Sequence, residues 1–441
     1  MASDQPGREA SEVHPRVLVV GAEPFSYHTG TGITLSNLFR GWPADRLAQV
    51  HSAATPPAND VCGSFRFFPP RPAIVDRLVR RGRVPGRVAA GAGPAAPDAV
   101  RGGWRRLVHR ELRAAADVRP LHVPRGLRSW AVRQQPDVIY SMLGSVRVMT
   151  LVRRLAEVTG APVVPHFMDD WPSTLYAARD LGGLGRWRLT EAIRQVVRRA
   201  PFGLCIGDEM AREYEGRYGI RFTAFMNCVD QAAFDQYRES RPVGVDATGR
   251  QVVEFVYVGG LHLGRWESLA RIGRALETAV PGSARLTVHA PERDLARYGD
   301  AFRPLSAVRL GHSVASTEVG GVLAGADVLV HVESFAPDTA RYTRLSVSTK
   351  LPQYLAAGRP VLAHGPAELA SMRHLQRAGA AVIVGAEEST LLAVRIAQLC
   401  ADPALRQRLG DSGHAFAKLC HGQQQVAERF AAELARAARR S

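Results

Sequence analysis

Hydroxyl side chains, a lysine and glycines gather in one stretch of the second half of the chain. Ser348 and Thr349 precede the run LPQYLAAG, which has the pattern of a helix that ends at Gly358. A helix start offers free backbone N–H groups, and together with two hydroxyls and the Lys350 cation these groups suit a phosphate. Gln353 lies one turn further along, within reach of a ribose. A capped helix without a ligand would not account for hydroxyls, cation and glycines at one strand end.

A second phosphate-binding pattern follows the predicted strand VVEFVYVGG. Gly259 and Gly260 let the backbone approach a ligand closely, and Arg265 begins the next predicted helix. A glycine turn followed by a fixed cation suits a diphosphate. The alternative is that Arg265 is one more surface arginine.

The segment PHFMDDWP (165–172) places polar side chains directly after another predicted strand. His166, Asp169 and Asp170 there suggest a polar floor for sugar hydroxyls, with His166 near the reacting carbon. The alternative is a helix capped by Asp170 or Ser173, with His166 as a hydrogen-bonded core residue. No metal dependence is expected of the two aspartates.

A glycine-bearing turn, GAEPFSYHTGTGIT, leaves the first predicted strand. Gly32 comes at the start of a helix, where an anion is favoured, so it is a candidate donor-binding residue. Leu35 occupies the third glycine position of the dinucleotide fingerprint, which excludes that motif. A plain strand-to-helix turn explains the pattern equally well.

The elements that position these residues alternate between short apolar runs and longer helical patterns, which is typical of parallel α/β domains. Predicted strands in the first half are 16–21, 136–143, 161–167, 202–207 and 221–227. Those in the second half are 252–260, 284–290, 326–332, 359–365 and 380–385. We therefore expect an α/β protein with two doubly wound, Rossmann-like domains facing each other across a cleft.

The composition also predicts the domain boundaries. We expect a disordered tail at 1–14, an N-terminal domain at 15–230, a Pro/Gly-bearing linker at 231–250, a C-terminal domain at 251–420 and a closing helix at 421–441. The five scattered cysteines form no pair with metal-ligand spacing. No zinc site or disulfide is expected, and a reducing cytoplasmic compartment fits best.

Together these motifs resemble the GT-B glycosyltransferases, in particular glycosyltransferase family 4. STKLPQYLAAGRPVLAHGP is similar to the donor-site helix and strand of that family, and YVGGLHLGRW to its diphosphate-binding turn. PHFMDDWP resembles the strand end that carries a histidine beside the sugar, and FMNCVD the crossing between domains. The family often has two glutamates in its donor site; here Leu345 and Gln353 fall at those positions. Glu333, further upstream, is the expected substitute carboxylate.

The resemblance implies a hexosyltransferase-type enzyme of polysaccharide biosynthesis. It would move a sugar from a nucleotide-diphosphate donor to a hydroxyl of a polysaccharide or lipid-linked acceptor, without a metal and with retention. The nucleotide sugar is a substrate, so no cofactor is implied. The catalytic residues implied are His166, Arg265 and Lys350. Two alternatives stay open: a nucleotide-sugar epimerase of the same fold, or an inactive nucleotide-binding partner subunit.

Positive charge is concentrated in one segment of the predicted first domain. The chain has 57 Lys+Arg against 41 Asp+Glu, a net charge of +16, and only Lys350 and Lys418 are lysines. Residues 71–133 carry fifteen arginines and four acids, hence +11. One interpretation of this basic insertion is peripheral contact with the anionic inner face of the cell membrane. The alternative is a solvated surface whose arginines point into water. Trp104 and Trp130 are its only aromatic residues, too few for a nucleic-acid stacking platform.

Overall fold

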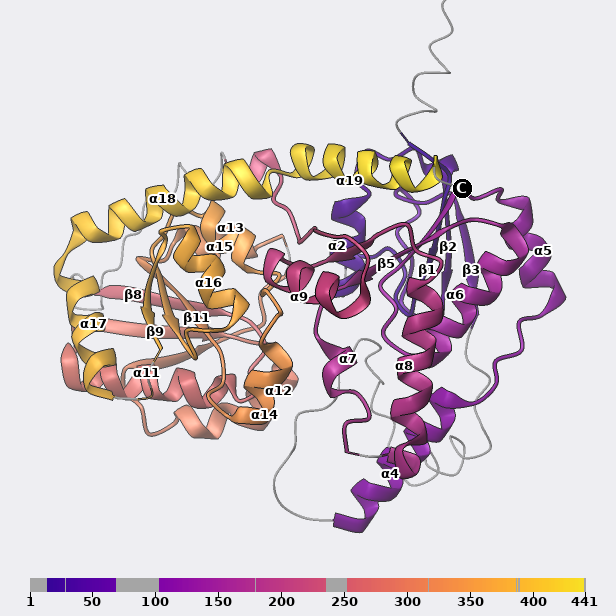
Figure 1. Cartoon of the computed structure of the whole chain (residues 1–441). Coiled ribbons are helices and arrows are strands. Elements are labelled where there is room, and N and C mark those ends of the chain that lie inside the picture. The colour runs from indigo at the N-terminus through magenta and orange to yellow at the C-terminus, as the bar shows by residue number, and fades with distance from the viewer. Residues whose placement is uncertain are drawn as a thin grey trace, which may run out of the picture. The chain divides into compact units, whose positions relative to one another are not determined.

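The computed structural model describes residues 14–68 and 103–439, apart from residues 28, 179, 235–251, 316, 386 and 388. Residues 71–102 of the basic insertion, the predicted tail up to residue 13 and most of the predicted linker lie outside the described residues. The chain divides into two compact units (Figure 1). The first comprises residues 1–226 and 427–441, and the second comprises residues 227–426.

The first unit is built on a parallel sheet of seven strands in the order β3-β2-β1-β4-β5-β6-β7. The strands are β1 (Val17–Val20), β2 (Leu47–His51), β3 (Ser64–Phe67), β4 (Val138–Ser141), β5 (Val163–Phe167), β6 (Gly203–Cys205) and β7 (Phe222–Ala224). Its helices are α2 (Gly30–Leu38), α4 (Gly103–Val118), α5 (Arg125–Arg133), α6 (Val146–Thr159), α7 (Trp171–Thr174), α8 (Leu184–Val197) and α9 (Asp208–Tyr218), with 3-10 turns η1 (Ala44–Arg46) and η2 (Asp180–Gly183).

Local sequence signals explain where the helices of this unit begin and end. The Ser145 hydroxyl accepts a hydrogen bond from the backbone N–H of Val148 and caps α6. Gly160 ends that helix with a φ of 77°, a left-handed conformation that glycine adopts without strain. Helices α6 and α8 pack against each other, and both contact the sheet.

The second unit has a parallel sheet of six strands in the order β10-β9-β8-β11-β12-β13. The strands are β8 (Val253–Val258), β9 (Ala284–His289), β10 (Val308–Gly311), β11 (Val328–Val332), β12 (Val361–His364) and β13 (Ala381–Val384). Its helices are α11 (Arg265–Ala279), α12 (Glu292–Tyr298), α13 (Val319–Ala324), α14 (Pro337–Thr343), α15 (Leu351–Ala356), α16 (Ala370–Arg377), α17 (Ser389–Ala401) and α18 (Pro403–His421), with the 3-10 turn η3 (Gly299–Phe302).

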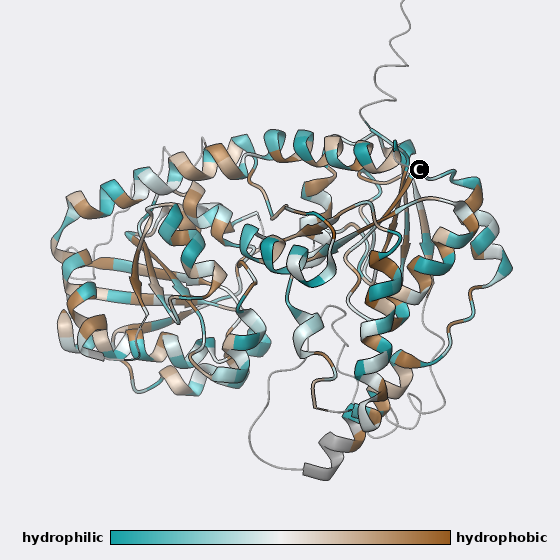
Figure 2. Ribbon diagram, in the orientation of Figure 1, coloured by the Kyte–Doolittle hydropathy of each residue, from teal (hydrophilic) through white to brown (hydrophobic). Residues whose placement is uncertain are grey.

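The predicted fold class, two doubly wound parallel α/β units, is confirmed. The central strands of both sheets are apolar and form the cores (Figure 2). Three strands, β2, β3 and β10, were not predicted, because none has a continuous apolar run. β2 buries the polar residues Gln49 and His51, β3 is half exposed at the edge of its sheet, and β10 carries the exposed Arg309 and Leu310.

The last helix, α19 (Gln423–Ala438), supplies part of the core of the first unit. Phe430 is completely buried, and its ring centroid lies 5.0 Å from Phe39, 5.6 Å from Tyr140 and 5.4 Å from Phe225. The edge-on arrangement of these rings is the favourable one for aromatic pairs. Residues 427–441 therefore complete a core that begins more than 380 residues earlier in the sequence.

Candidate functional site

The second sheet changes direction between β8 and β11. The chain leaves β8 for β9 on one side, while β11 pairs with the other side of β8. Ligands of doubly wound sheets bind beyond the carboxyl ends of the strands at such a switch point. Here those ends carry Gly259 and Gly260 after β8, and Glu333 after β11, so three predicted site residues meet there.

Arg265 is held at this switch point by Glu333. Its Nη2 lies 3.4 Å from Oε1 and 3.5 Å from Oε2 of the Glu333 carboxylate, which is almost completely buried. The Glu333 carbonyl accepts a hydrogen bond from the Ser268 hydroxyl at 2.9 Å, which fixes this strand end to α11. Gly264, just before Arg265, has a φ of 70°, and a Cβ there would come within 2.6 Å of the Ser334 hydroxyl. The backbone conformation that positions Arg265 therefore requires a glycine at residue 264.

Lys350 brings a second cation to the same place. Its amine lies 5.7 Å from the centroid of the Tyr257 ring, and a Cβ at Gly259 would overlap it. Within the described part of the chain, Lys350 has no carboxylate in an ion pair. Burial of the amine, reinforced by the Arg265 charge, lowers the pKa of Lys350 to about 7, although Glu333 and Asp294 favour the charged form. The amine is thus a desolvated group whose charge the Glu333 and Asp294 carboxylates compensate only in part.

His331 was not predicted as part of the site. It lies near the end of β11, almost completely buried, with Nε2 3.5 Å from Glu333 Oε1 and without a hydrogen-bond partner among the described residues. Burial and the nearby charges of Arg265 and Lys350 lower the pKa of His331 to about 3, so the ring is neutral. The only signal in the sequence is a polar residue inside the apolar run ADVLVHV.

Asp294 is a second residue that the motifs did not indicate. It is buried on α12, and its carboxylate accepts a hydrogen bond from the backbone N–H of Leu261 at 2.8 Å. The same oxygen lies 3.5 Å from Nδ1 of His262. Asp294 therefore holds the turn after Gly260 in place, next to the two cations.

The region before α15 differs from the predicted phosphate cradle. The helix begins at Leu351, is six residues long and has Pro352 in its first turn, which removes one N–H. The backbone N–H of Ser348 already donates to the Ser371 hydroxyl at 3.1 Å. The carbonyl of Thr349 accepts a hydrogen bond from the Asn227 side chain at 3.2 Å. In the expected row of N–H groups, that of Ser348 is therefore engaged and Pro352 supplies none.

Gln353 and Leu345 are the residues that the sequence resemblance placed at two glutamate positions. Gln353 lies in the first turn of α15 and is partly exposed, as a residue that contacts a ribose must be. Leu345 is buried in the hydrophobic interior. Among these candidates, Glu333 is therefore the carboxylate that lies with Arg265 at the switch point.

In the first unit, His166 has the environment of a core residue. It is completely buried on β5, where the Tyr140 hydroxyl donates to Nδ1 at 2.7 Å. Nε2 donates to the carbonyl of Phe225 at 3.0 Å. Burial lowers the pKa of His166 to about 4, against the effect of the backbone hydrogen bonds. Both ring nitrogens are engaged, so the alternative of a hydrogen-bonded core histidine describes it and the expected contact with a sugar is not supported.

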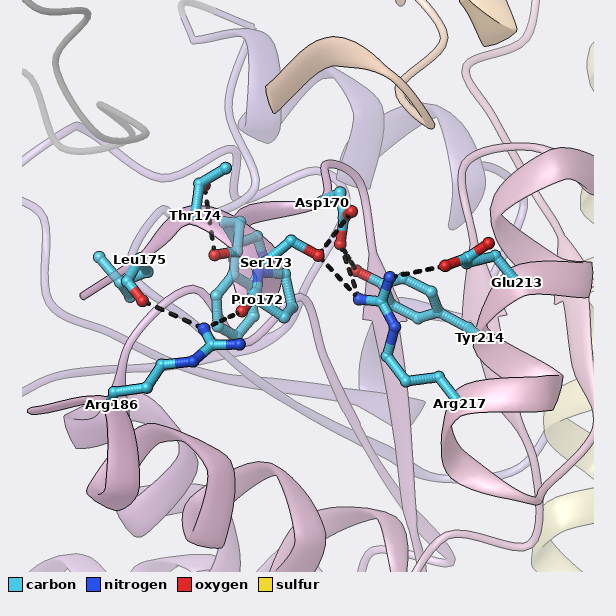
Figure 3. A network of polar contacts seen from close by, with 10 residues as sticks. Asp170, Pro172, Ser173, Thr174, Leu175, Arg186, Glu213, Tyr214 and Arg217 are labelled. Carbon is cyan, nitrogen blue, oxygen red and sulfur yellow. Dashed lines mark hydrogen bonds and ion pairs between the residues drawn. The ribbon is translucent and has the colours of Figure 1, made fainter. Parts of the chain in front are cut away.

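Asp170 is the centre of a buried polar network (Figure 3). One carboxylate oxygen accepts hydrogen bonds from the Tyr214 hydroxyl at 2.7 Å and from Arg217 at 3.0 Å. The other accepts from the Ser173 hydroxyl at 2.7 Å, and Arg217 also pairs with Glu213 at 3.0 Å. The network ties α7 to α9, which gives Asp170 a structural task.

Asp169 and Gly32 are the other predicted site residues of the first unit. Asp169 lies just after β5, and Gly32 lies in α2, the helix that follows β1. Asp169 is partly exposed beside Asp170. Gly32 is buried in the first turn of α2, where its N–H donates to the Thr29 hydroxyl at 3.1 Å. A Cβ at Gly32 would lie 2.7 Å from Cβ of Ser26, so close packing explains this glycine.

Arg265, Lys350 and Glu333 form a cluster at the β8/β11 switch point. This cluster can neutralise a diphosphate. Arg265 offers a planar set of donors and Lys350 offers a compact charge, while Glu333 holds the arginine in place. Among the described residues, no group of three or more His, Cys, Asp or Glu side chains is arranged to hold a metal ion. Within the same residues, no helix is both long and apolar enough to cross a bilayer.

Known structures resemble the chain over almost its whole length. The Anabaena protein HepE (Alr3699), solved in complex with UDP, superposes with a TM-score of 0.63 at 13% identity and covers 95% of this chain and 99% of its own. Sucrose-phosphate synthase from Thermosynechococcus elongatus gives 0.62 at 11%, covering 97% and 100%. WaaG, a glycosyltransferase involved in lipopolysaccharide biosynthesis, gives 0.53 at 14%, covering 94% and 98%.

The sequence itself matches no protein-family model and no curated protein. At the identities above, structural likeness establishes the fold, and function must be argued from the site. The chain has the two-domain, Rossmann-like fold of the GT-B glycosyltransferases.

Proposed function

We propose that the protein is a glycosyltransferase that moves a sugar from a nucleoside-diphosphate donor to an acceptor hydroxyl. The observation that carries the proposal is the pair of cations at the β8/β11 switch point. Arg265 is held there by Glu333, while the Lys350 amine lies against Gly259 with no ion-pair partner in the described chain. HepE has been solved with UDP and with UDP-glucose, which makes UDP-sugars the first donors to test.

The proposed reaction breaks the bond between the sugar C1 and the diphosphate oxygen. The diphosphate leaves with the electron pair, the acceptor oxygen bonds to C1, and its proton passes to the departing diphosphate. Lys350 and Arg265 stabilise the charge that grows on the leaving group, each by about 3 kcal/mol. Because two fixed cations supply this stabilisation, we propose a metal-independent course, and the resemblance to family 4 favours retention. His166 has no role in this scheme, since both of its ring nitrogens are engaged.

The acceptor is proposed to be a hydroxyl of a polysaccharide or of a lipid-linked glycan. The charge of +11 over residues 71–133 supports an acceptor presented at an anionic surface, such as the cytoplasmic face of a membrane. Nucleic acid is not proposed as a partner.

The test uses a panel of nucleotide sugars. Thermal shift measures which of them bind the protein, and release of the nucleoside diphosphate measures turnover. We expect Lys350→Ala and Arg265→Ala each to lower turnover about a hundredfold. Lys418→Ala is the matched control, because it removes the only other lysine, an exposed one on α18. Unchanged turnover in both site variants would refute the site assignment.

The acceptor separates this function from its alternatives. A transferase releases nucleoside diphosphate in proportion to added acceptor, whereas an epimerase converts the nucleotide sugar without one. Tight nucleotide binding with no turnover under any acceptor would indicate a non-catalytic partner subunit.

A further inference from the structure

The start of α8 exposes two large apolar side chains on one face. Trp187 is 59% exposed and Leu184 is 46% exposed. They are three residues apart in the helix and therefore lie side by side. Exposed apolar side chains that lie next to each other, unlike single scattered ones, mark a candidate interaction surface.

A third exposed apolar side chain, Val108, comes from α4. The two helices contact each other (Figure 1). Arg110 of α4 forms an ion pair with Asp180, and the Glu111 carboxylate accepts a hydrogen bond from the backbone N–H of Leu181 at 2.6 Å. These contacts attach α4 to the turn that begins α8, one helical turn from Val108. We call Val108, Leu184 and Trp187 the α4/α8 patch.

Arginines outnumber acids on the two helices: α4 carries four arginines and two acids, and α8 carries three arginines and one acid. The guanidinium of Arg188 lies 5.3 Å from the centroid of the Trp187 ring, so ring and charge are presented together. Arg110 is 46% exposed, whereas its partner Asp180 is almost fully buried. Glu191 is paired with Arg194 on the same helix. The two helices therefore combine exposed apolar side chains with an excess of positive charge.

A similar apolar pair elsewhere lacks this setting. Leu391 and Val394 on α17 are also three residues apart and exposed, 37% and 57%. Glu387, which precedes α17, pairs with Arg271 at 2.9 Å, and Arg395 is exposed next to Val394. The pair on α17 therefore has an arginine beside it but no aromatic ring, whereas the α4/α8 patch has both.

We propose that the α4/α8 patch docks on a bilayer surface rich in anionic lipids. Tryptophan and leucine enter the boundary between headgroups and acyl chains, and the arginines contact the lipid phosphates. The same chain carries further arginines between residues 71 and 102, directly before α4 in the sequence, which adds attraction of the same sign. Docking is independent of donor chemistry, although it deepens the proposed function by bringing a lipid-linked acceptor to the enzyme.

The test measures binding of the full chain to vesicles, without any nucleotide sugar. Vesicles of phosphatidylcholine alone and vesicles that also contain phosphatidylglycerol are sedimented with the protein. We expect binding only to the second kind, weakened by salt, with a blue shift of tryptophan fluorescence. Leu184→Ala/Trp187→Ala should lower the partition coefficient about tenfold or more. Leu391→Ala/Val394→Ala is the matched control and should bind as the wild type does.

Two outcomes would overturn the proposal. One is a double variant at Leu184 and Trp187 that binds anionic vesicles as well as the wild type. The other is a wild-type protein that does not bind vesicles but forms a dimer, with the dimer lost in the double variant. In that case the patch would join two copies of the chain. Unchanged melting temperatures of both double variants exclude misfolding as the cause. Donor turnover in detergent is measured separately, so failure of docking and failure of the proposed function remain distinguishable.

Discussion

Protonation of Lys350 should control the affinity for a nucleoside diphosphate. The pKa of its amine is lowered from 10.5 to about 7, first by desolvation and then by the charge of Arg265. A bound diphosphate adds negative charge beside the amine and stabilises the charged form. Above pH 7 the free protein is increasingly neutral at Lys350, so binding must take up a proton from solution.

The size of the effect follows from the fraction of charged amine. About half of the amines are protonated at pH 7 and about one in a hundred at pH 9, so affinity should fall about fiftyfold over this range. The ligand does not contribute, because its terminal phosphate ionises near pH 6 and is a dianion throughout. Calorimetric titration with UDP in buffers of different ionisation enthalpy measures both the affinity and the proton uptake.

Variants isolate the cause of the pH dependence. Lys350→Ala should bind weakly at every pH and lose the slope, whereas Lys418→Ala should keep both affinity and slope. A wild-type affinity that stays constant from pH 7 to pH 9, or a slope that survives in Lys350→Ala, would show that Lys350 does not control nucleotide affinity. An amine-specific reagent gives an independent readout, since Lys350 should react faster than Lys418 near pH 7 and be protected by UDP.

Three further predictions concern the site and the cores. Glu333→Gln removes the charge that orients Arg265, so the donor KM should rise about tenfold in steady-state kinetics; an unchanged KM would show that the arginine needs no partner. Phe430→Ala should cost about 3–5 kcal/mol in denaturant unfolding, and a loss below 1 kcal/mol would contradict its place in the core. His166 has a folded pKa of about 4 against 6.5 unfolded, so the unfolded state binds the extra proton as pH falls. Stability should therefore drop below pH 6.5 by about 1.4 kcal/mol per pH unit from this group, and urea midpoints that fall equally in His166→Gln would assign the loss elsewhere.

The fold could be predicted from the sequence because most strands are continuous runs of apolar residues. The exceptions show the physical limit of that signal. In β2, Gln49 is completely buried, yet its amide holds the loop after β1 through hydrogen bonds to Phe25 and Glu23. A polar residue that is buried because its partners come from another part of the chain cannot be recognised from its own neighbours in sequence.

The candidate site was predicted in part for the same reason. Glycines and cations that follow a strand directly, such as Gly260 and Arg265, are visible as a local pattern. His331 and Asp294 take part only because the sheet order brings β8, β9 and β11 together. His166 shows the opposite case, since its position at a strand end suggested chemistry, whereas two hydrogen bonds and full burial assign it to the core.

The position of Phe430 has a consequence for synthesis and dissection of the chain. The first unit is discontinuous, so a nascent chain that has emerged through residue 226 still lacks the ring that fills the space between Phe39, Tyr140 and Phe225. Its core can close only after residue 430 has emerged from the ribosome, whereas the second unit is encoded as one uninterrupted stretch. A gene fragment for residues 227–426 is therefore the natural piece to express alone, and any cut that removes α19 leaves the core built by residues 1–226 incomplete.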